Sequence, residues 1–488
     1  MGNATSSSRD KYLMMLWVLT IVGFFVRLYM AHVDPFLHIW DERFHALVAR
    51  NMMDNPFVPM LRANPVFPAD HTNWTQNHIW LHKQPLFMWQ MAISMKVFGA
   101  TEYALRYPSV IMGTLMIPMV YQITKFISND KRVSLITAGL FCFSNFHVEL
   151  VGGIRSMDHN DLALEFYVLA SIWSLVMYEK TKKKYWIVLI GLCSGAAILT
   201  KWLIGLFVFL LWGVKILLQI KERNSRNEII YLLLALFVCC AVFVPWQLYI
   251  MNRFPIEAAY EYEFNRRHIT EIIEGHSGTI FFYLERFPQL FGEGIFVLIF
   301  PGIYLFIKSK KNKQYAIPIL LGVLLVFSFF SFLVKSKTIS HLFFIAPFML
   351  MFMAYCLSFL IQKLKRNYLV IPFLIGVGVL SCKPEKIILD QSKNNEERNK
   401  EIANSLVYKN LSNKLPDSIA IVTNVPDCIS LMFYNKRLTA YETFSEAQIE
   451  ELKKRKLPIA VFKNVSNHQV SPHILNYPYL YILEDSLK

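Results

Sequence analysis

The sequence predicts an α-helical polytopic membrane protein with about eleven transmembrane helices and a small C-terminal α/β domain. Of its 488 residues 55% are hydrophobic and only 17% are charged, whereas soluble domains carry about 25% charge. Apolar runs of roughly 18 residues or more recur along the chain, and each is long enough to cross a hydrocarbon core. The net charge of +15 is concentrated in alternate short loops, as the positive-inside rule requires. This placement indicates cytoplasmic anchoring loops and argues against nucleic-acid binding.

The apolar runs define the order of the spans, with the N-terminus on the inner side. We expect spans at residues 12–31, 105–127, 133–151, 162–178, 185–200, 202–219, 229–250, 288–307, 314–333, 341–361 and 369–382. The last run is short for a span; if it crosses, the rest of the chain is external. We therefore divide the chain into a transmembrane domain, residues 1–382, and a soluble domain, residues 383–488, on the outer side.

Two loops on the outer side are long, residues 32–104 and 251–287. The first contains two helical patterns, Glu42–Met53 and Pro85–Phe98, that are too polar or too short to span. One face of the first pattern is apolar, which predicts a helix lying in the membrane interface; it consists of Phe44, Leu47, Val48 and Met52. Several tryptophans suit the headgroup region: Trp40, Trp74, Trp80 and Trp89. Both loops lie on one side, which indicates that the protein acts at its outer face.

The tail is typical of an α/β domain. The stretches SIAIVTNV, LTAYE, IAVFKN and YLYILED are typical of strands. SEAQIEELKKRK predicts a helix with a capping box from Ser445 to Gln448 and a hydrophobic staple of Phe444 with Ile449. The tail has no glycine-rich phosphate loop and no metal-binding cluster, so its sequence assigns it no chemistry.

Carboxylates near the outer ends of spans are the first candidate site residues. Asp41 and Glu42 follow the first span and begin a helix; they are a site or simply favourable partners of the helix dipole. Arg155, Asp158 and Asp161 lie together in the outer loop RSMDHND. Charges packed this tightly between apolar runs need partners or water, so they form either a site or a structural ion-pair cluster.

Cations at the same ends are the second group. Lys83 precedes a predicted helix N-terminus, where its ammonium and the backbone N–H groups can face an anion; the alternative is a snorkelling lysine. Lys201 lies in LTKW at an outer helix end. Further candidates in the later loops are Arg266, Arg267, Lys335, Lys337 and His276. Several cations with two or three carboxylates suit an anionic, membrane-held substrate, but their spacing does not name the reaction.

Taken in order, these motifs resemble those of the GT-C membrane glycosyltransferases, above all the branch with the lipid A aminoarabinose transferases and the protein O-mannosyltransferases. The similarity runs from about residue 12 to 361. It rests on Asp41-Glu42, Lys83-Gln84-Pro85-Leu86, Gly99 through Glu102, Ala104, Arg106, Pro108 and Ser109, Arg155 through Asp158 and Asp161, Leu199-Thr200-Lys201-Trp202, Asn265-Arg266, Gly275-His276-Ser277-Gly278, and Ser336-Lys337 through His341. Three residues depart from the pattern: Gln84 replaces a proline, Trp202 replaces a glycine, and His82 replaces a frequent acidic residue.

The resemblance implies a GT-C fold and inverting transfer of a sugar from a polyprenyl-phosphate donor to a lipid A-like acceptor, at the periplasmic face of a bacterial inner membrane. Asp41, Glu42 and Asp158 are then the catalytic candidates, and Lys83, Arg155, Asp161, Lys201, Arg266 and Lys337 bind the donor phosphate or substrate. No cofactor is required, although His82 and His276, with Asp41, suit zinc or manganese. Transfer to Ser or Thr of proteins is one alternative, and a transporter or flippase of lipid-linked sugars is another. We see no internal repeat of the kind that transporters often have.

Overall fold

The structure is a computed structural model that describes residues 3–70, 72–154, 159–221, 225–309, 313–363, 376, 395–466 and 469–488. It forms two compact units, each built from separate stretches of the chain. The bundle unit contains Met1–Ala31, Lys83–Phe87 and Ser109–Pro384, and the loop–tail unit contains His32–His82, Met88–Pro108 and Glu385–Lys488. The expected span at 369–382 and the candidates Arg155 and Asp158 lie outside the described residues.

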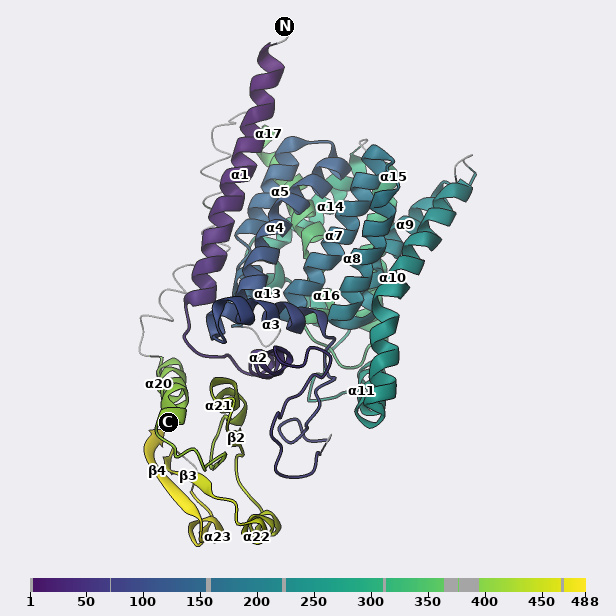
Figure 1. Cartoon of the computed structure of the whole chain (residues 1–488). Coiled ribbons are helices and arrows are strands. Elements are labelled where there is room, and N and C mark those ends of the chain that lie inside the picture. The colour runs from purple at the N-terminus through teal and green to yellow at the C-terminus, as the bar shows by residue number, and fades with distance from the viewer. Residues whose placement is uncertain are drawn as a thin grey trace. The chain divides into compact units, whose positions relative to one another are not determined.

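Long apolar helices run side by side in the bundle unit (Figure 1). The principal ones are α1 (Asn3–His32), α4 (Glu102–Ser128, which belongs to this unit from Ser109 on), α5 (Lys131–Cys142), α6 (Asn145–Val151), α7 (His159–Thr181), α8 (Tyr185–Lys201), α9 (Phe207–Leu218), α10 (Ser225–Arg253), α14 (Ile299–Lys308), α15 (Lys313–Ser328) and α17 (Ala346–Lys363). Within the described ranges, seven helical segments are long and apolar enough to cross a membrane, or eight if the bent pair α5 and α6 counts as one span. The protein is therefore an integral membrane protein.

One of the expected spans differs from the structure. The segment expected at 288–307 is broken into shorter helices; the longest apolar one, Phe296–Lys308, has 13 residues that extend about 20 Å at 1.5 Å per residue. The two runs expected at 185–200 and 202–219 lie in one apolar segment, Tyr185–Leu218, which counts once by length and composition. Seven or eight of the described segments satisfy length and composition, and the count of eleven stays a prediction.

The chain reverses direction where these two runs meet. Ser194 Oγ donates a hydrogen bond to the Gly205 carbonyl, eleven residues further on, whereas a straight helix would separate them by about 16 Å. Gly205 is needed at this approach, because a Cβ there would come within 2.8 Å of the Ile198 backbone nitrogen. Between them lies the short 3₁₀ helix η1 (Trp202–Leu206), whose first residue has φ +53°.

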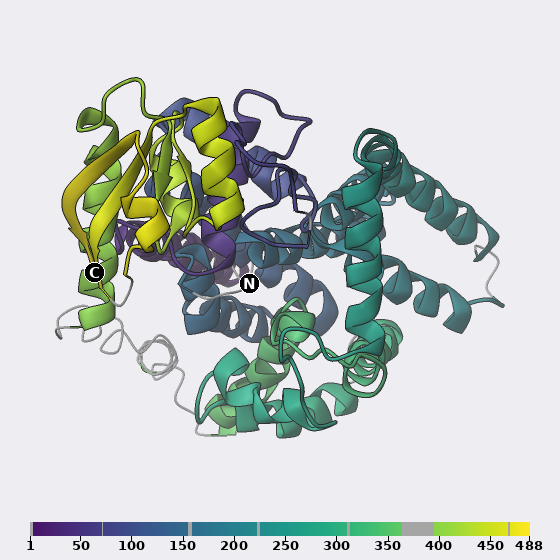
Figure 2. The same cartoon turned by 90° about the horizontal axis from the view of Figure 1, so that it is seen from below.

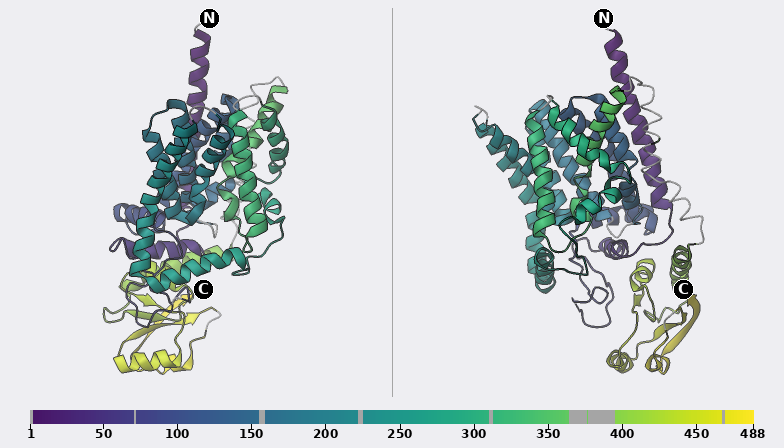
Figure 3. Two further views of the ribbon diagram at one scale, coloured as in Figure 1. Left: turned by 90° about the vertical axis from the view of Figure 1, so that its right-hand side faces the viewer. Right: turned by 180° about the vertical axis from the view of Figure 1, so that it is seen from behind.

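The second long outer loop begins with α11 (Pro255–Thr270). Proline at its first position has no N–H to lose and is favoured there, and the preceding Phe254 leaves the helical region, with ψ +60°. Helix α11 consequently turns away from α10 and lies across one end of the bundle (Figure 3). Three short helices follow: α12 (Phe282–Glu285), α13 (Phe287–Phe291) and, before α17, α16 (Ser340–Phe343).

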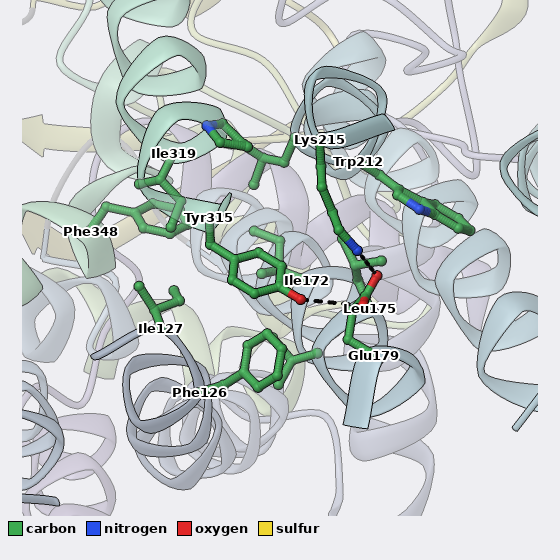
Figure 4. A pocket seen from close by; sticks show the side chains of 13 residues that line it. Phe126, Ile127, Ile172, Leu175, Glu179, Trp212, Lys215, Tyr315, Ile319 and Phe348 are labelled. Atoms are coloured by element: carbon green, nitrogen blue, oxygen red, sulfur yellow. Dashed lines mark hydrogen bonds and ion pairs between the residues drawn. The ribbon is translucent and has the colours of Figure 1, made fainter. Parts of the chain in front are cut away.

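Inside the bundle, a cavity of about 40 Å³ lies between α4, α7, α9, α15 and α17 (Figure 4). Its polar groups are already paired: the Glu179 carboxylate accepts from Lys215 Nζ and from the Tyr315 hydroxyl. The volume has room for only a few waters. The cavity therefore encloses a satisfied ion pair and is too small for a sugar or lipid.

The loop–tail unit contains α2 (Asp41–Met52), α3 (Leu86–Phe98) and the tail. The tail forms a parallel four-stranded sheet in the order β2-β1-β3-β4, with β1 Ile421–Thr423, β2 Thr439–Ala440, β3 Ile459–Val465 and β4 Leu480–Leu487. Helices lie on both sides of it (Figure 2); they are α20 (Glu396–Asn410), α21 (Cys428–Tyr434), α22 (Glu446–Arg455) and α23 (Pro472–Leu475). All four expected strands are present, and Ser445 and Gln448 form the predicted capping box of α22.

The prediction that the first amphipathic helix lies in the membrane interface is wrong. The apolar face of α2 is buried inside the protein, where Phe44, Leu47, Val48 and Met52 are each at most 5% exposed. Phe44 stacks on Trp80, with ring centroids 4.7 Å apart, and α2 packs against α21 of the tail. Trp80 is likewise a core residue, 4% exposed, rather than a headgroup anchor.

Candidate functional site

The adjacent carboxylates Asp41 and Glu42 open helix α2 but have different surroundings. Asp41 is the first residue of the helix and is half-buried. Glu42 is 1% exposed. Its two oxygens accept from Arg106 Nε at 2.7 Å and Nη2 at 3.0 Å, and one also accepts from the His38 backbone N–H at 2.7 Å. A carboxylate held in this way positions the loop; of the two, only Asp41 remains a catalytic candidate.

The Glu42–Arg106 pair is the centre of a larger buried network. Arg106 also donates to the carbonyls of Asp34 and Phe36, at 2.8 and 2.7 Å. The His38 ring bridges Asp34 and Glu42, with 3.0 Å to each carboxylate. Burial opposes the charged imidazolium, but hydrogen bonds to these two carboxylates raise the pKa of His38 overall. The segment between the first span and Asp41 is thus fixed by charge-assisted hydrogen bonds.

The tail supplies further partners to the same segment. Arg43 contacts Glu401 of α20 at 2.8 Å and Asp427, the N-cap of α21, at 3.1 Å. Asp34 accepts from Arg398 Nε at 2.6 Å, and Glu102 pairs with Lys409 at 2.8 Å. Arg62, 3% exposed, donates to the Ala440 carbonyl at 2.9 Å. The sequence indicated no chemistry for the tail. Its contacts show that it stabilises the loop that carries Asp41.

His82 lies in an aromatic cluster of the loop–tail unit. Its ring meets Trp74 and Trp80 edge-on, with centroids 4.4 and 5.5 Å away. Edge-on contacts of this kind orient the imidazole ring of His82 through side-chain packing.

In the bundle unit, Lys201 and Asp161 form an ion pair of 2.7 Å at the ends of α8 and α7. Asp161 is 1% exposed, whereas the Lys201 side chain keeps 21% exposure. Asp161 therefore holds Lys201 in place, and the lysine side chain stays partly exposed. This is the first contact between two candidates that the sequence proposed separately.

His341 belongs to the surroundings of Lys201. Burial, and then the charges of Lys201, His268 and His276, lower the pKa of His341 to about 3. Its ring stacks on Phe330 at 4.5 Å, and its Nδ1 lies 2.9 Å from the Tyr283 hydroxyl. Burial and the neighbouring positive charges therefore both oppose the imidazolium form of His341.

Sequence reasoning missed Glu261, which lies on α11 and is 5% exposed. Burial raises the pKa of its carboxyl to about 7, and the charges of Lys83 and His268 oppose that rise. The candidate Lys83 thus has a neighbouring acid that changes charge near neutral pH. In the sequence, Glu261 is one of several glutamates in a polar helical stretch, so no local signal distinguished it.

Three further candidates have more ordinary surroundings. Lys337 is 6% exposed, and its Nζ donates to the carbonyls of Thr279 and Ser331 at 2.8 and 2.7 Å, so it ties two segments together. Arg266 is 63% exposed and pairs with Glu263, three residues earlier on α11. His276 is 46% exposed and lies 3.8 Å from Glu274. Their surroundings indicate structural or surface roles.

The structure brings no metal site together within the parts of the chain that it describes. No group of three His, Cys, Asp or Glu side chains there is arranged to hold a metal ion. His82 belongs to the loop–tail unit and His276 to the bundle unit. A zinc or manganese ion at these residues stays a prediction.

Comparison with solved structures defines the class of the fold: it is the fold of the GT-C membrane glycosyltransferases, as the sequence motifs indicated. ArnT from Cupriavidus metallidurans, bound to undecaprenyl phosphate, matches with a TM-score of 0.64 and 16% identity over 92% of this chain and 90% of that one. The Archaeoglobus fulgidus oligosaccharyltransferase matches with a TM-score of 0.57 and 13% identity over 87% of this chain and 64% of that one.

Sequence comparisons agree with this class. The family model of the dolichyl-phosphate-mannose-protein mannosyltransferases (PMT_2) matches residues 82–249, a range that includes Lys83, Asp161 and Lys201. Undecaprenyl phosphate-alpha-4-amino-4-deoxy-L-arabinose arabinosyl transferase 2 of Proteus mirabilis is 27% identical over 290 residues, which are 57% of this chain and 50% of that protein. The chain thus spans about half the length of the curated relatives it matches.

Proposed function

We propose that this protein is an inverting glycosyltransferase that moves a sugar from a polyprenyl-phosphate donor to a lipid A-like acceptor at the periplasmic face of a bacterial inner membrane. The observation that carries the proposal is the Lys201–Asp161 pair, which places a partly exposed lysine side chain where two apolar helices end. The similarity of this region to undecaprenyl-phosphate aminoarabinose transferases supports a lipid-linked sugar as the ligand.

The chemistry follows from the charges that develop during transfer. As the bond between the anomeric carbon and the phosphate oxygen breaks, positive charge grows on the sugar and negative charge on the phosphate. Lys201 and Lys83 stabilise the leaving phosphate. The acceptor oxygen forms the new bond from the opposite face, which inverts the anomeric centre.

Asp41 is assigned to the acceptor side of the reaction. If the acceptor is a hydroxyl, the Asp41 carboxylate takes its proton. If the acceptor is a phosphate, no base is needed, and Asp41 positions the acceptor or steadies the positive sugar. The network of Glu42, Arg106 and His38 orients the first turn of α2 and thereby Asp41. Lys337 is assigned to ordering the later outer loop, because its ammonium donates to the carbonyls of Thr279 and Ser331.

Mass spectrometry of lipid A and of extracytoplasmic proteins tests the proposal in cells with and without the chain. We expect a sugar-sized mass on lipid A that is lost without the chain and is not restored by Asp41→Asn. A loss confined to proteins would instead assign the O-glycosylation activity. Unchanged lipid A and proteins, with lipid-linked sugar accumulating on the inner face, would assign the flippase alternative; activity of the purified chain in detergent excludes it.

A further inference from the structure

Trp202 occupies a backbone conformation that is unfavourable for its side chain. Its φ of +53° lies in the region that glycine adopts freely and that a bulky residue enters only at a cost in energy. In the families that this chain resembles, the corresponding residue of the motif is glycine. A tryptophan at a position where glycine would be unstrained indicates that contacts of the indole offset the strain.

The Trp202 indole packs against an aromatic side chain of α11. Its ring centroid lies 5.3 Å from that of Tyr262 at an interplanar angle of 64°. Both side chains are only half-buried, so the pair keeps an accessible side. The rings of Trp202 and Tyr262 therefore form a partly exposed aromatic surface, called the aromatic wall below, and are not part of the bundle's interior core.

Two hydrogen bonds connect this aromatic wall to Gln84, the second residue that departs from the family pattern. The Tyr262 hydroxyl donates to Gln247 Oε1 at 2.7 Å, and Gln247 Nε2 donates to Gln84 Oε1 at 2.8 Å. Gln84 is 2% exposed and stands where the similar families have a proline. Gln84 and Trp202, far apart in the sequence, are thus coupled through Tyr262 and Gln247.

Each of these two departures directly follows a lysine of the donor site. Gln84 follows Lys83, and Trp202 follows Lys201, the two cations to which the proposed function assigns the leaving phosphate. The sugar is bonded to that phosphate, so residues adjoining the two lysines are placed to meet it. Aromatic faces that cover apolar C–H groups, together with a few polar groups that fix orientation, are the usual lining of small-molecule sites.

We propose that Trp202, Tyr262 and Gln247 form the subsite for the donor sugar, with Gln84 as the residue that positions Gln247. This inference rests on the proposed function and extends it, because it assigns sugar selectivity to named residues. The indole and phenol rings pack on the C–H face of a pyranose ring, and the Gln247 amide hydrogen-bonds to its hydroxyl or amino groups.

The test compares donor lipids with and without a sugar. Purified protein in detergent binds a fluorescent undecaprenyl phosphate, and three competitors are titrated: undecaprenyl phosphate, its mannose ester and its 4-amino-4-deoxy-L-arabinose ester. We expect wild type to bind at least one sugar-bearing lipid about tenfold more tightly than the bare lipid. Trp202→Gly, which relieves the strain, and Tyr262→Ala should abolish that preference and leave the affinity for the bare lipid within about twofold.

Two controls separate a sugar contact from a general structural role. Trp202→Phe and Tyr262→Phe keep a ring and should retain most of the preference. Tyr260→Ala removes an aromatic residue of α11 that packs on Phe264 instead and should retain all of it. Equal affinity of wild type for bare and sugar-bearing lipids, or a preference that survives Trp202→Gly, would overturn the inference. Failure of wild type to bind any of the lipids would overturn the proposed function itself.

Discussion

Glu42 and Arg106 form a buried ion pair, with Oε1 and Nε 2.7 Å apart and both side chains fully buried, although 64 residues separate them in the sequence. Arg106 lies in the first part of α4 and Glu42 in the first turn of α2. The pair therefore ties the start of the second apolar helix to the turn that carries Asp41. We therefore assign a role in stability to Glu42 and a role in catalysis to Asp41. Substitutions at the two positions can distinguish these roles.

Replacing Glu42 by Gln should destabilise the protein without removing its chemistry. Loss of one partner from a buried pair leaves an uncompensated charge and costs about 3–5 kcal/mol. We expect a lower thermal midpoint in detergent, with transfer activity preserved per folded molecule at low temperature. Asp41→Asn should behave in the opposite way, with an unchanged midpoint and no transfer. Full stability of Glu42→Gln together with lost activity would return Glu42 to the catalytic group.

Replacing Arg43 by Met tests the support that the tail gives to the loop. The substitution leaves Glu401 and Asp427 without the guanidinium that contacts both. We expect a fall in the midpoint and faster proteolysis of the first outer loop, measured by limited digestion. Arg437→Met is the matched control, because its partner Asp417 is fully exposed and surface pairs contribute only about 0–1 kcal/mol. Equal effects of the two substitutions would contradict the assigned role.

Lys201 and Arg266 should differ in their effect on donor binding. The double variant Lys201→Met with Asp161→Asn removes the ammonium without leaving a buried carboxylate unpaired. It should weaken binding of undecaprenyl phosphate about tenfold or more, since each charge-assisted contact is worth about 1.5–3 kcal/mol. Arg266→Met should change it less than about twofold, because that guanidinium is exposed and paired with Glu263. Competition binding in detergent measures both, and similar losses would show that Arg266 also binds phosphate.

Glu261 predicts a pH dependence of donor binding near neutrality. Its pKa of about 7 leaves the carboxyl neutral below that pH, so the charge of Lys83 is then not offset. We expect affinity for undecaprenyl phosphate-mannose to fall severalfold as the pH rises from about 6 to 8, a range in which its phosphodiester keeps one charge. Glu261→Gln should remove this dependence. A slope that persists in the variant would assign the titration to another group.

The same group predicts the sign of a stability change. The folded chain holds the Glu261 proton more tightly than the unfolded chain, whose pKa is about 4.5. Stability should therefore decrease as the pH rises from about 4.5 through 7. Glu261→Gln should be more stable than wild type above pH 7 and similar below about 4.5, as thermal midpoints across this range would show.

Metal removal tests the prediction that no cofactor is required. Exhaustive dialysis against a chelator should leave transfer within about twofold of the untreated rate, because a polyprenyl phosphate stabilised by lysines is already a workable leaving group. Activity that disappears and returns on addition of zinc or manganese would contradict this expectation. His82→Ala and His276→Ala would then show whether either imidazole holds the ion.

Local patterns predicted much of the fold, because each depends on residues close together in the chain. Hydrophobic runs locate most helices of the bundle unit, and the alternation and capping signals of the tail locate its four strands and α22. The ordered motifs indicated the GT-C class for the same reason. Asp41, Lys83 and Lys201 could be selected because charges at the ends of apolar runs are costly and therefore noticeable.

The partners of those charges depended on long-range contacts. No local pattern pairs Glu42 with Arg106, Arg43 with the tail, or Lys201 with Asp161, because each contact joins segments that only folding brings together. Burial, which raises the pKa of Glu261 and turns α2 from an expected surface helix into a core element, is likewise a property of the packed structure. The sequence identifies the charged groups, and their three-dimensional surroundings decide which of them can act on a substrate.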